Sequence, residues 1–212
     1  MKNLDFIYKR HSVRKFKDCE VPTEDIKEII KAATYSATGK NLQHWHYVVI
    51  KNKDKIIELA DVVEKEHFRL LDEINDENIK KNFGKYRKFQ TIFKYAPVVI
   101  LAYAGEYPTT GLDVLEDIGA RDQVINELLQ SNSGMQTMGA SIENLLLAAA
   151  NTGYGGCWIT GANFASRVID DYIKFDKEGC FLTAIVTLGV PEESELKSPK
   201  RKPLDEILTI IE

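Results

Sequence analysis

One stretch of this chain, residues 133–153, repeats its apolar side chains at helical spacing and has few ways to fold. The stripe consists of Met135, Met138, Ile142, Leu145 and Ala149. Leu146, Leu147 and Ala148 widen it until the segment is apolar nearly all round. A helix of that kind has to be surrounded by other elements, so the sequence predicts a central, buried helix. Gly153 is expected to end it in a left-handed conformation.

The other periodic segments predict helices and short strands in mixed order. Further helices are expected over 21–37, where Thr23 caps the start, over 54–74, and after Asn163, which is expected to act as the cap. Strands are expected over 45–52, 96–106, 155–160 and 180–190. The stretch 106–130 is charged and partly helical. Strands and helices do not alternate strictly, which favours an α+β fold with a mostly antiparallel sheet. No linker divides the chain, so we expect a single domain over 1–212.

Composition excludes several function classes. The net charge of -4 and pI near 5.7 argue against a nucleic-acid or membrane-surface binder, which needs excess Lys and Arg. No apolar run reaches the roughly 20 residues that span a bilayer, and the N-terminus lacks the pattern of a secretory signal. The three widely spaced cysteines fit a reducing cytoplasm. Neither they nor the histidines have metal-ligand spacing, so no metal site is expected.

A basic cluster near the N-terminus, "KRHSVRKF", contrasts with the acidic total. Arg10, His11, Ser12 and Arg14 offer two fixed cations, an imidazole and a hydroxyl within five residues. Such groups can donate many hydrogen bonds to a phosphate. A solvated basic turn explains the same residues equally simply, so this segment alone leaves both interpretations open.

Two further segments combine small and polar residues. "SATGKNLQHWHYVVI" contains Ala37, Thr38 and Asn41 and leads from a helix into a strand, where a plain turn is one interpretation and a binding loop the other. "NTGYGGCWITG" contains closely spaced glycines, which allow close approach of backbones. It does not fit the dinucleotide fingerprint, because Trp158 stands where the third glycine belongs and a helix precedes it.

A second basic segment, "KSPKRKPLDE", lies near the C-terminus and includes Lys197, Lys200, Arg201 and Lys202. It is either an exposed turn or a further anion contact. The chain shows no nucleophile elbow, phosphate-binding loop or acid pair, so we assign no catalytic side chain. If this chain is an enzyme, a bound cofactor is expected to carry the chemistry.

Together and in this order, the four segments resemble the FMN-dependent nitroreductase family from about Tyr8 to Leu208. "RHSVRKF" is similar to the family's Arg-x-Ser-x-Arg signature, and "SATGKNLQHWHYVV" to its Ser-x-x-x-x-Asn-x-Gln-Pro-Trp segment. "IENLLLAAANTGYGGCWITG" resembles its central helix, glycine turn and strand, and "KRKPLDEIL" its phosphate-binding C-terminal end.

The resemblance implies an intertwined homodimer with FMN at the subunit interface. It implies that Arg10, His11 and Ser12 hold the phosphate and ribityl chain, and that Arg14 reaches the pyrimidine end of the ring. Ile159, Thr160 and Gly161 would line one ring face, with a backbone N–H near Thr160 facing the reactive ring nitrogen. Arg201, helped by Lys200 or Lys202, would reach the phosphate. Ala37, Thr38 and Asn41 would come from the partner subunit.

Two departures from the family pattern concern the site. His44 stands where the family has Pro before Trp45, and Thr160 stands where some members have an acidic residue. The stretch 83–130, where the family varies its substrate lid, matches nothing in the pattern.

The function implied is an oxidoreductase that takes hydride from NAD(P)H and reduces nitroaromatics, quinones or similar acceptors by a ping-pong mechanism. The alternatives are a specialised flavin dehydrogenase of the same fold, a flavin-binding protein without turnover, and an interaction protein whose basic segments are only surface.

Overall fold

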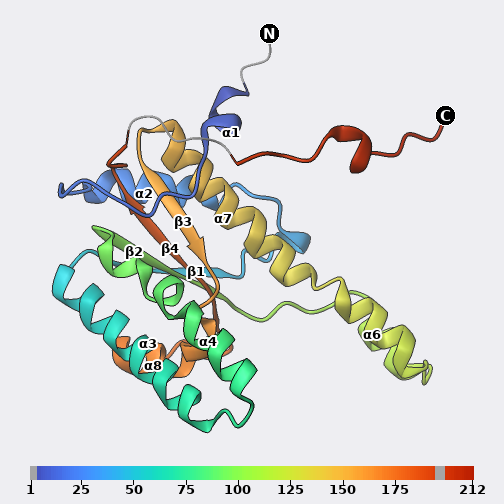
Figure 1. Cartoon of the computed structure of the whole chain (residues 1–212). Coiled ribbons are helices and arrows are strands. Elements are labelled where there is room, and N and C mark those ends of the chain that lie inside the picture. The colour runs from blue at the N-terminus through green and yellow to red at the C-terminus, as the bar shows by residue number, and fades with distance from the viewer. Residues whose placement is uncertain (1–3, 194–198) are drawn as a thin grey trace.

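The core of the protein is a four-stranded antiparallel sheet in the order β1-β2-β4-β3. The computed structural model describes residues 4–193 and 199–212. The strands are β1 (Trp45–Ile50), β2 (Val98–Ala104), β3 (Gly155–Ile159) and β4 (Phe181–Gly189). This confirms the predicted α+β class and antiparallel sheet, with β1 and β3 at the edges (Figure 1).

The two central strands are apolar on both faces because helices cover both faces. Every residue of β2 is buried, and so is every residue of β4 after the first. One face packs against α2 (Thr23–Ala33) and α7 (Ser133–Asn151). The other packs against α3 (Lys53–Glu73) and α8 (Ser166–Ile173), and α4 (Glu77–Gln90) lies against α3. Figure 1 shows these helical layers on either side of the strands.

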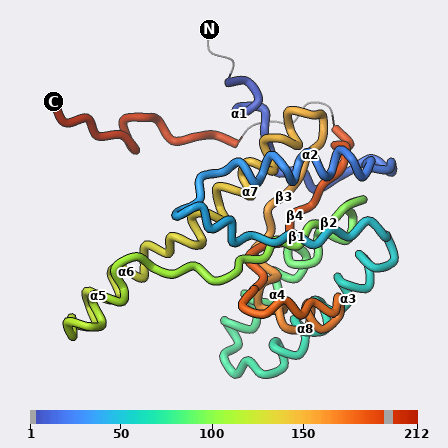
Figure 2. The backbone as a smooth tube through the Cα atoms, turned by 180° about the vertical axis from the view of Figure 1, so that it is seen from behind, coloured from blue at the N-terminus to red at the C-terminus, as the bar shows by residue number. Residues whose placement is uncertain are grey.

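Shorter elements connect the layers or project from them. The chain begins with α1 (Asp5–Lys9), a short helix that the sequence analysis missed. The charged stretch after β2 forms α5 (Leu112–Asp117) and α6 (Asp122–Gln130), which extend away from the sheet (Figures 1 and 2). The C-terminal segment 199–212 also extends outward. Short 3-10 turns span Gly39–Asn41, Ile92–Tyr95, Asn163–Ala165 and Leu204–Glu206. Within the described parts of the chain, no helix has the length and apolarity needed to cross a membrane.

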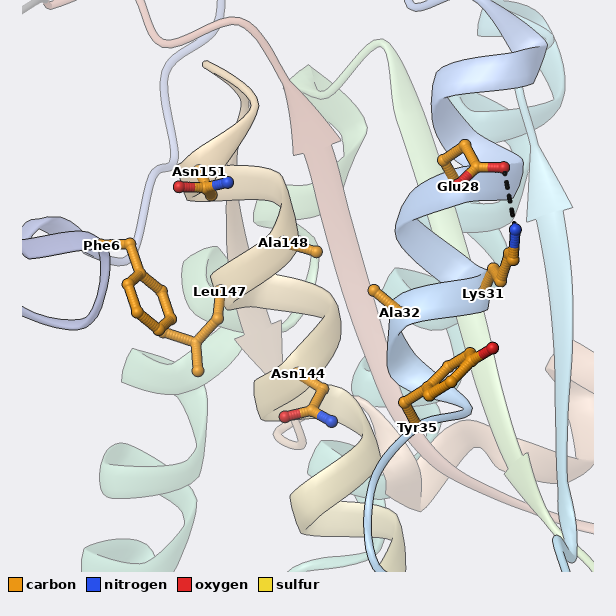
Figure 3. A pocket seen from close by; sticks show the side chains of 9 residues that line it. All are labelled: Phe6, Glu28, Lys31, Ala32, Tyr35, Asn144, Leu147, Ala148 and Asn151. Carbon is orange, nitrogen blue, oxygen red and sulfur yellow. Dashed lines mark hydrogen bonds and ion pairs between the residues drawn. The ribbon is translucent and has the colours of Figure 1, made fainter. Parts of the chain in front are cut away.

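Helix α7 is the central helix that the sequence predicts, but one flank is uncovered. Met138, Ile142, Leu145 and Ala149 are at most 1% exposed, and Gly153 follows the helix with φ of 86°, which confirms the predicted end. Leu147 and Ala148 are only half-buried. With side chains from α1 and α2, they line a groove of about 630 Å³. Figure 3 shows Phe6 and Tyr35 at its sides.

Two predicted helix caps are wrong, because both side chains bond to distant parts of the chain. Thr23 is the first residue of α2 rather than its cap, and its Oγ1 accepts a hydrogen bond from Lys51 Nζ at 3.0 Å. Asn163 lies in a 3-10 turn, and its Nδ2 donates to the carbonyl of Thr183 at 2.6 Å. Tertiary contacts therefore took precedence over local capping.

The buried face of α3 ends on a histidine. The predicted helix over 54–74 buries Ile56, Leu59, Ala60 and Val63, and the next buried residue is His67, at 1% exposed. Leu70, three residues further along α3, is half-buried. Burial lowers the pKa of His67, because the charged imidazolium is poorly solvated there.

Two glycines in different elements should respond oppositely to the addition of a methyl group. A Cβ at Gly156 would lie 2.3 Å from the carbonyl oxygen of Thr187, so we expect Gly156→Ala to lower the free energy of unfolding by about 1–3 kcal/mol. A Cβ at Gly84, inside α4, meets nothing closer than 3.9 Å. Gly84→Ala should therefore raise the free energy of unfolding by roughly 0.5–1 kcal/mol through helix propensity. Urea unfolding at one protein concentration measures both, and equal effects would contradict the packing described at Gly156.

Burial of His67 should make unfolding depend on pH. The unfolded chain takes up a proton near pH 6.5, while the lowered pKa keeps the folded imidazole neutral. Stability from this group is therefore complete above that pH and is lost as pH falls toward the lowered pKa. We expect His67→Phe to flatten the decline of unfolding free energy between about pH 7 and 5 without abolishing it, because the pKa values of His44 and His46 are also lowered by burial.

The matched control for His67 is Leu59→Ala in the same helix. Leu59 is fully buried, so this variant should lose about 2–5 kcal/mol at every pH and keep the original slope. A His67→Phe variant with an unchanged slope would show that His67 does not contribute to the pH dependence.

Candidate functional site

The N-terminal basic segment runs along the edge strand β3. Ser12 and Gly156 form a parallel bridge, and the Val13 N–H donates to the Gly156 carbonyl at 2.8 Å. A Cβ at Gly155 would lie 2.4 Å from Val13 Cγ2. The glycines of this strand therefore allow the segment to pack directly onto it.

This pairing brings three of the predicted site residues around Cys157. Burial raises the pKa of the Cys157 thiol. Its environment also contains the charge and hydrogen-bonding group of Arg14, the hydroxyl of Ser12 and the charge of Arg10, which act in the opposite direction. Arg10, Ser12 and Arg14 thus converge on one part of β3 from the neighbouring segment. Because burial dominates, the thiol remains a poor nucleophile.

The two arginines of the segment differ in their partners. Arg10 is mostly buried, and its Nε lies 3.1 Å from Glu143 Oε1 on α7, which fixes its direction. Arg14 is exposed and makes no ion pair with a carboxylate in the described residues. It lines a groove of about 1260 Å³ together with Lys51 and Lys94. His11 is half-buried, and its Nδ1–H donates to the carbonyl of Lys9 at 2.5 Å.

The end of β3 presents the second predicted group of residues. Ile159 is buried, whereas Thr160 and Gly161 are exposed. The Thr160 carbonyl accepts a hydrogen bond from the Asn163 N–H at 3.0 Å, which turns the chain sharply after the strand. Gln90, the last residue of α4, lies next to Gly161, because its Cγ is 3.7 Å from where a Cβ of residue 161 would be.

The loop that carries Ala37, Thr38 and Asn41 follows the C-terminal end of α2. Thr38 Oγ1 accepts from the Gln43 N–H at 3.2 Å, and Asn41 Oδ1 accepts from Gln43 Nε2 at 3.1 Å. Asn41 has a φ of 52°, a conformation that asparagine tolerates better than most residues. The side chains of Thr38 and Asn41 thus both bond to Gln43, within the loop itself.

His44, which replaces the proline of the family pattern, ties this loop to two other elements. Its Nε2–H donates to the Gly134 carbonyl at the start of α7, at 3.2 Å. Its ring lies edge-on to Tyr107, with 5.0 Å between centroids. A Cβ at Gly39 would lie 2.1 Å from the Tyr107 hydroxyl, so this loop also depends on a glycine.

Lys200 and Arg201 lie on the outward C-terminal segment (Figure 1), and both are exposed. Lys197, in the same basic stretch, lies outside the described residues.

The residues around β3 suit a phosphorylated, planar cofactor such as FMN. The guanidinium groups of Arg10 and Arg14 and the hydroxyl of Ser12 converge near Cys157. Among the described residues, Glu143 is the only carboxylate that forms an ion pair with either arginine. Such donors bind phosphate oxygens strongly. Further along the same strand, Thr160 and Gly161 are exposed. In contrast, no group of three potential metal-ligating side chains occurs in the described ranges.

Sequence reasoning missed two buried polar residues beside this site, His67 and Gln90. Both are at most 3% exposed. His67 follows Val63 by four residues, so helical periodicity places it on the buried face of α3. Gln90 had no comparable signal, because its burial results from contacts between distant elements.

Comparison with known proteins gives consistent matches over the chain. A BluB-like flavoprotein of Clostridium difficile 630 is 42% identical, with a TM-score of 0.92 and full coverage of both chains. A nitroreductase with bound FMN from Bacteroides fragilis has a TM-score of 0.71 over both full chains at 19% identity, which indicates a shared fold. The iodotyrosine deiodinase of Hydra vulgaris is 29% identical over 210 residues, which cover 94% of this chain and 69% of that protein.

The family pattern agrees with these similarities. The Nitroreductase family matches residues 7–190, which include the basic segment, the loop after α2, helix α7 and strand β3. This chain therefore belongs to the Nitroreductase family.

Proposed function

We propose that this protein is an FMN-dependent oxidoreductase that uses NAD(P)H to reduce nitroaromatics, quinones or similar electron-poor acceptors. The observation that carries the proposal is the convergence of Arg10, Ser12 and Arg14 on β3, the strand that leads to the exposed Thr160 and Gly161. Support comes from the family membership and from 42% identity to a protein described as a flavoprotein.

The roles that we propose for individual residues are those implied by the resemblance to the family. Arg10, His11 and Ser12 bind the phosphate and ribityl chain, and Arg14 approaches the pyrimidine end of the ring. Ile159, Thr160 and Gly161 line one ring face, with a backbone N–H near Thr160 directed at the reactive ring nitrogen. Ala37, Thr38 and Asn41 arrive from the partner subunit, and Lys200 and Arg201 approach the phosphate.

The protein's part in the reaction is binding, orientation and charge. When bound, FMN supplies the two-electron chemistry by which hydride from NAD(P)H is passed to the acceptor. The fixed cations favour a negatively charged cofactor, and we assign no side chain as acid, base or nucleophile. Cys157 does not take a covalent role, because burial keeps its pKa raised.

We also propose a homodimer in which the whole chain, 1–212, acts as one FMN-binding domain. The outward C-terminal segment exposes a set of large apolar side chains that a partner subunit can bury: Leu204, Ile207, Leu208, Ile210 and Ile211. The groove beside α7 in Figure 3 leaves Tyr35 80% exposed. The family resemblance, which implies that Ala37, Thr38 and Asn41 come from the other subunit, also supports a site shared between chains. Cys19, Cys157 and Cys180 are free, which supports a cytoplasmic location.

The similarity to an iodotyrosine deiodinase over 94% of this chain favours a second candidate at the same site. In reductive deiodination, two electrons and a proton replace iodine on an aromatic carbon by hydrogen, and iodide leaves. 3-Iodotyrosine is therefore the acceptor to test beside a nitroaromatic and a quinone. Iodide release at a higher kcat/KM than nitroaromatic reduction would favour this candidate over the first.

The purified full-length protein should be a yellow dimer whose flavin colour bleaches on anaerobic addition of NADH or NADPH. Because the sequence has no separate dinucleotide motif, the two substrates should use one flavin face in turn. Initial rates with a nitroaromatic acceptor should give parallel double-reciprocal lines.

Each measurement can contradict the proposal. A protein that stays colourless after incubation with FMN would favour the interaction-protein alternative. A yellow protein that NAD(P)H does not bleach would favour a flavin-binding protein without turnover. A monomer that retains FMN fully would contradict the shared site, and intersecting lines would contradict ping-pong kinetics.

Arg14 and Arg201 should affect different properties of the flavin. A charge ~4 Å from another contributes about 4 kcal/mol at an effective dielectric of 20, and screening leaves roughly 1–2 kcal/mol. The charge of Arg14 should favour the anionic reduced flavin ring over the neutral oxidised ring. Arg14→Met should remove this effect and lower the two-electron midpoint potential by roughly 20–45 mV. Arg201→Met should mainly weaken FMN binding, because the phosphate charge does not change with ring reduction.

Both variants are measured with excess FMN, so that lost cofactor is not mistaken for a shifted potential. The proposed placement of the two charges is wrong if Arg14→Met keeps the potential while Arg201→Met shifts it.

A further inference from the structure

A group of buried polar atoms without hydrogen-bond partners lies near the end of β3. Among the described residues, both ring nitrogens of His67, Oε1 of Gln90 and Oδ1 of Asn163 are buried and unpartnered. An unpartnered buried polar atom typically costs about 1–3 kcal/mol. Apolar side chains would avoid that cost, so these polar side chains need an explanation beyond packing.

His67 is held rigidly by aromatic rings. Phe83 from α4 stacks on it with 4.4 Å between centroids and 13° between planes, and Phe164 lies edge-on at 6.4 Å. Burial lowers the pKa of the imidazole, and the nearby hydrogen-bonding amide of Gln90 acts in the opposite direction. The charged groups that act on the ring are Arg87 and Glu64, whose effects oppose each other. The ring is therefore a fixed, neutral imidazole.

Gln90 connects this ring to the loop after β3. Its side chain packs beside Gly161, and its Oε1 is buried. The other side of the loop is fastened by Asn163, whose N–H binds the Thr160 carbonyl and whose side chain binds Thr183 on β4. The backbone of Thr160 and Gly161 is thus held between β4 and the end of α4.

We propose that His67 and Gln90 are positioning residues for the Thr160–Gly161 backbone at the flavin, an inference that rests on the proposed function. A neutral imidazole has one N–H donor and one acceptor nitrogen. With a small rotation of the Gln90 side chain, the His67 N–H donates to Gln90 Oε1, and this bond fixes the amide against Gly161. The loop then keeps the backbone N–H near Thr160 directed at the reactive nitrogen of the flavin ring, without reorganisation during the reaction.

The contact between the loop and the flavin should differ between the two oxidation states of the cofactor. In the proposed complex, the reactive nitrogen of the oxidised flavin ring would accept a hydrogen bond from the loop. In the reduced flavin, the same nitrogen would carry a proton. Loosening the loop should therefore weaken the binding of oxidised FMN more than the binding of reduced FMN.

The experiment compares four full-length variants with the original protein. Gln90→Met removes the amide at similar size, His67→Phe removes the ring nitrogens, and His67→Gln restores a donor. Tyr103→Phe is the matched control, because Tyr103 is fully buried on the same face of the sheet and its hydroxyl binds Asp170 at 2.6 Å. The readouts are amide hydrogen exchange of residues 159–163 without FMN, and the ratio of the dissociation constants of oxidised and reduced FMN.

Loss of one hydrogen bond should speed exchange of residues 159–163 about tenfold in Gln90→Met and His67→Phe. The same variants should raise the ratio of dissociation constants about tenfold, which corresponds to a midpoint potential about 30 mV higher. His67→Gln should return both values to within about threefold of the original protein, consistent with a partly restored bond. Tyr103→Phe should lower the melting temperature and change neither value.

Variants that lower the melting temperature but leave both readouts unchanged would overturn the inference, and so would a Tyr103→Phe control that shifts both. If Gln90→Met fails to fold, His67→Phe and its rescue by His67→Gln decide the question. If the original protein binds no FMN, the proposed function fails, while the exchange measurement still shows whether His67 and Gln90 hold the loop.

Discussion

The arrangement of the candidate site depends on the contact between the N-terminal segment and the edge strand β3. The Val13 N–H binds the Gly156 carbonyl at 2.8 Å, and the side chain of Val13 occupies the space that a Cβ at Gly155 would fill. A larger residue in this strand would push the segment outward. The glycine-rich strand and the basic segment, more than 140 residues apart in sequence, therefore form one structural unit.

The sheet and its helices explain why the site lies at an edge and why part of the molecule remains uncovered. Both faces of β2 and β4 are covered by helices, so backbone is accessible mainly at the ends and edges of the sheet. Helix α7 covers one face, yet its Leu147 and Ala148 line an open groove. The apolar C-terminal segment is likewise exposed. These surfaces cost free energy in water, which gives a physical reason for a partner subunit.

Periodicity predicted most of the fold, because the buried faces of α3 and α7 and the apolar strands are local patterns in the sequence. It failed where a side chain bonds to a distant residue. Thr23 and Asn163 look like caps locally but bind Lys51 and the backbone of Thr183. The burial of Gln90 is of the same kind, because it depends on the packing of α4 beside Gly161. The ordered set of motifs predicted the family, whereas the convergence of the basic residues on Cys157 required the structure.

The environment of Cys157 shows which kind of chemistry this site favours. A thiol near two arginines would become a thiolate nucleophile if their charges dominated. Here burial dominates and the pKa is raised, so the positive charge is not neutralised by the protein's own sulfur. Arg10 is partly compensated by Glu143, and Arg14 has no ion-pairing carboxylate among the described residues. Positive charge thus remains available along β3, which favours binding an anionic cofactor over covalent catalysis by side chains.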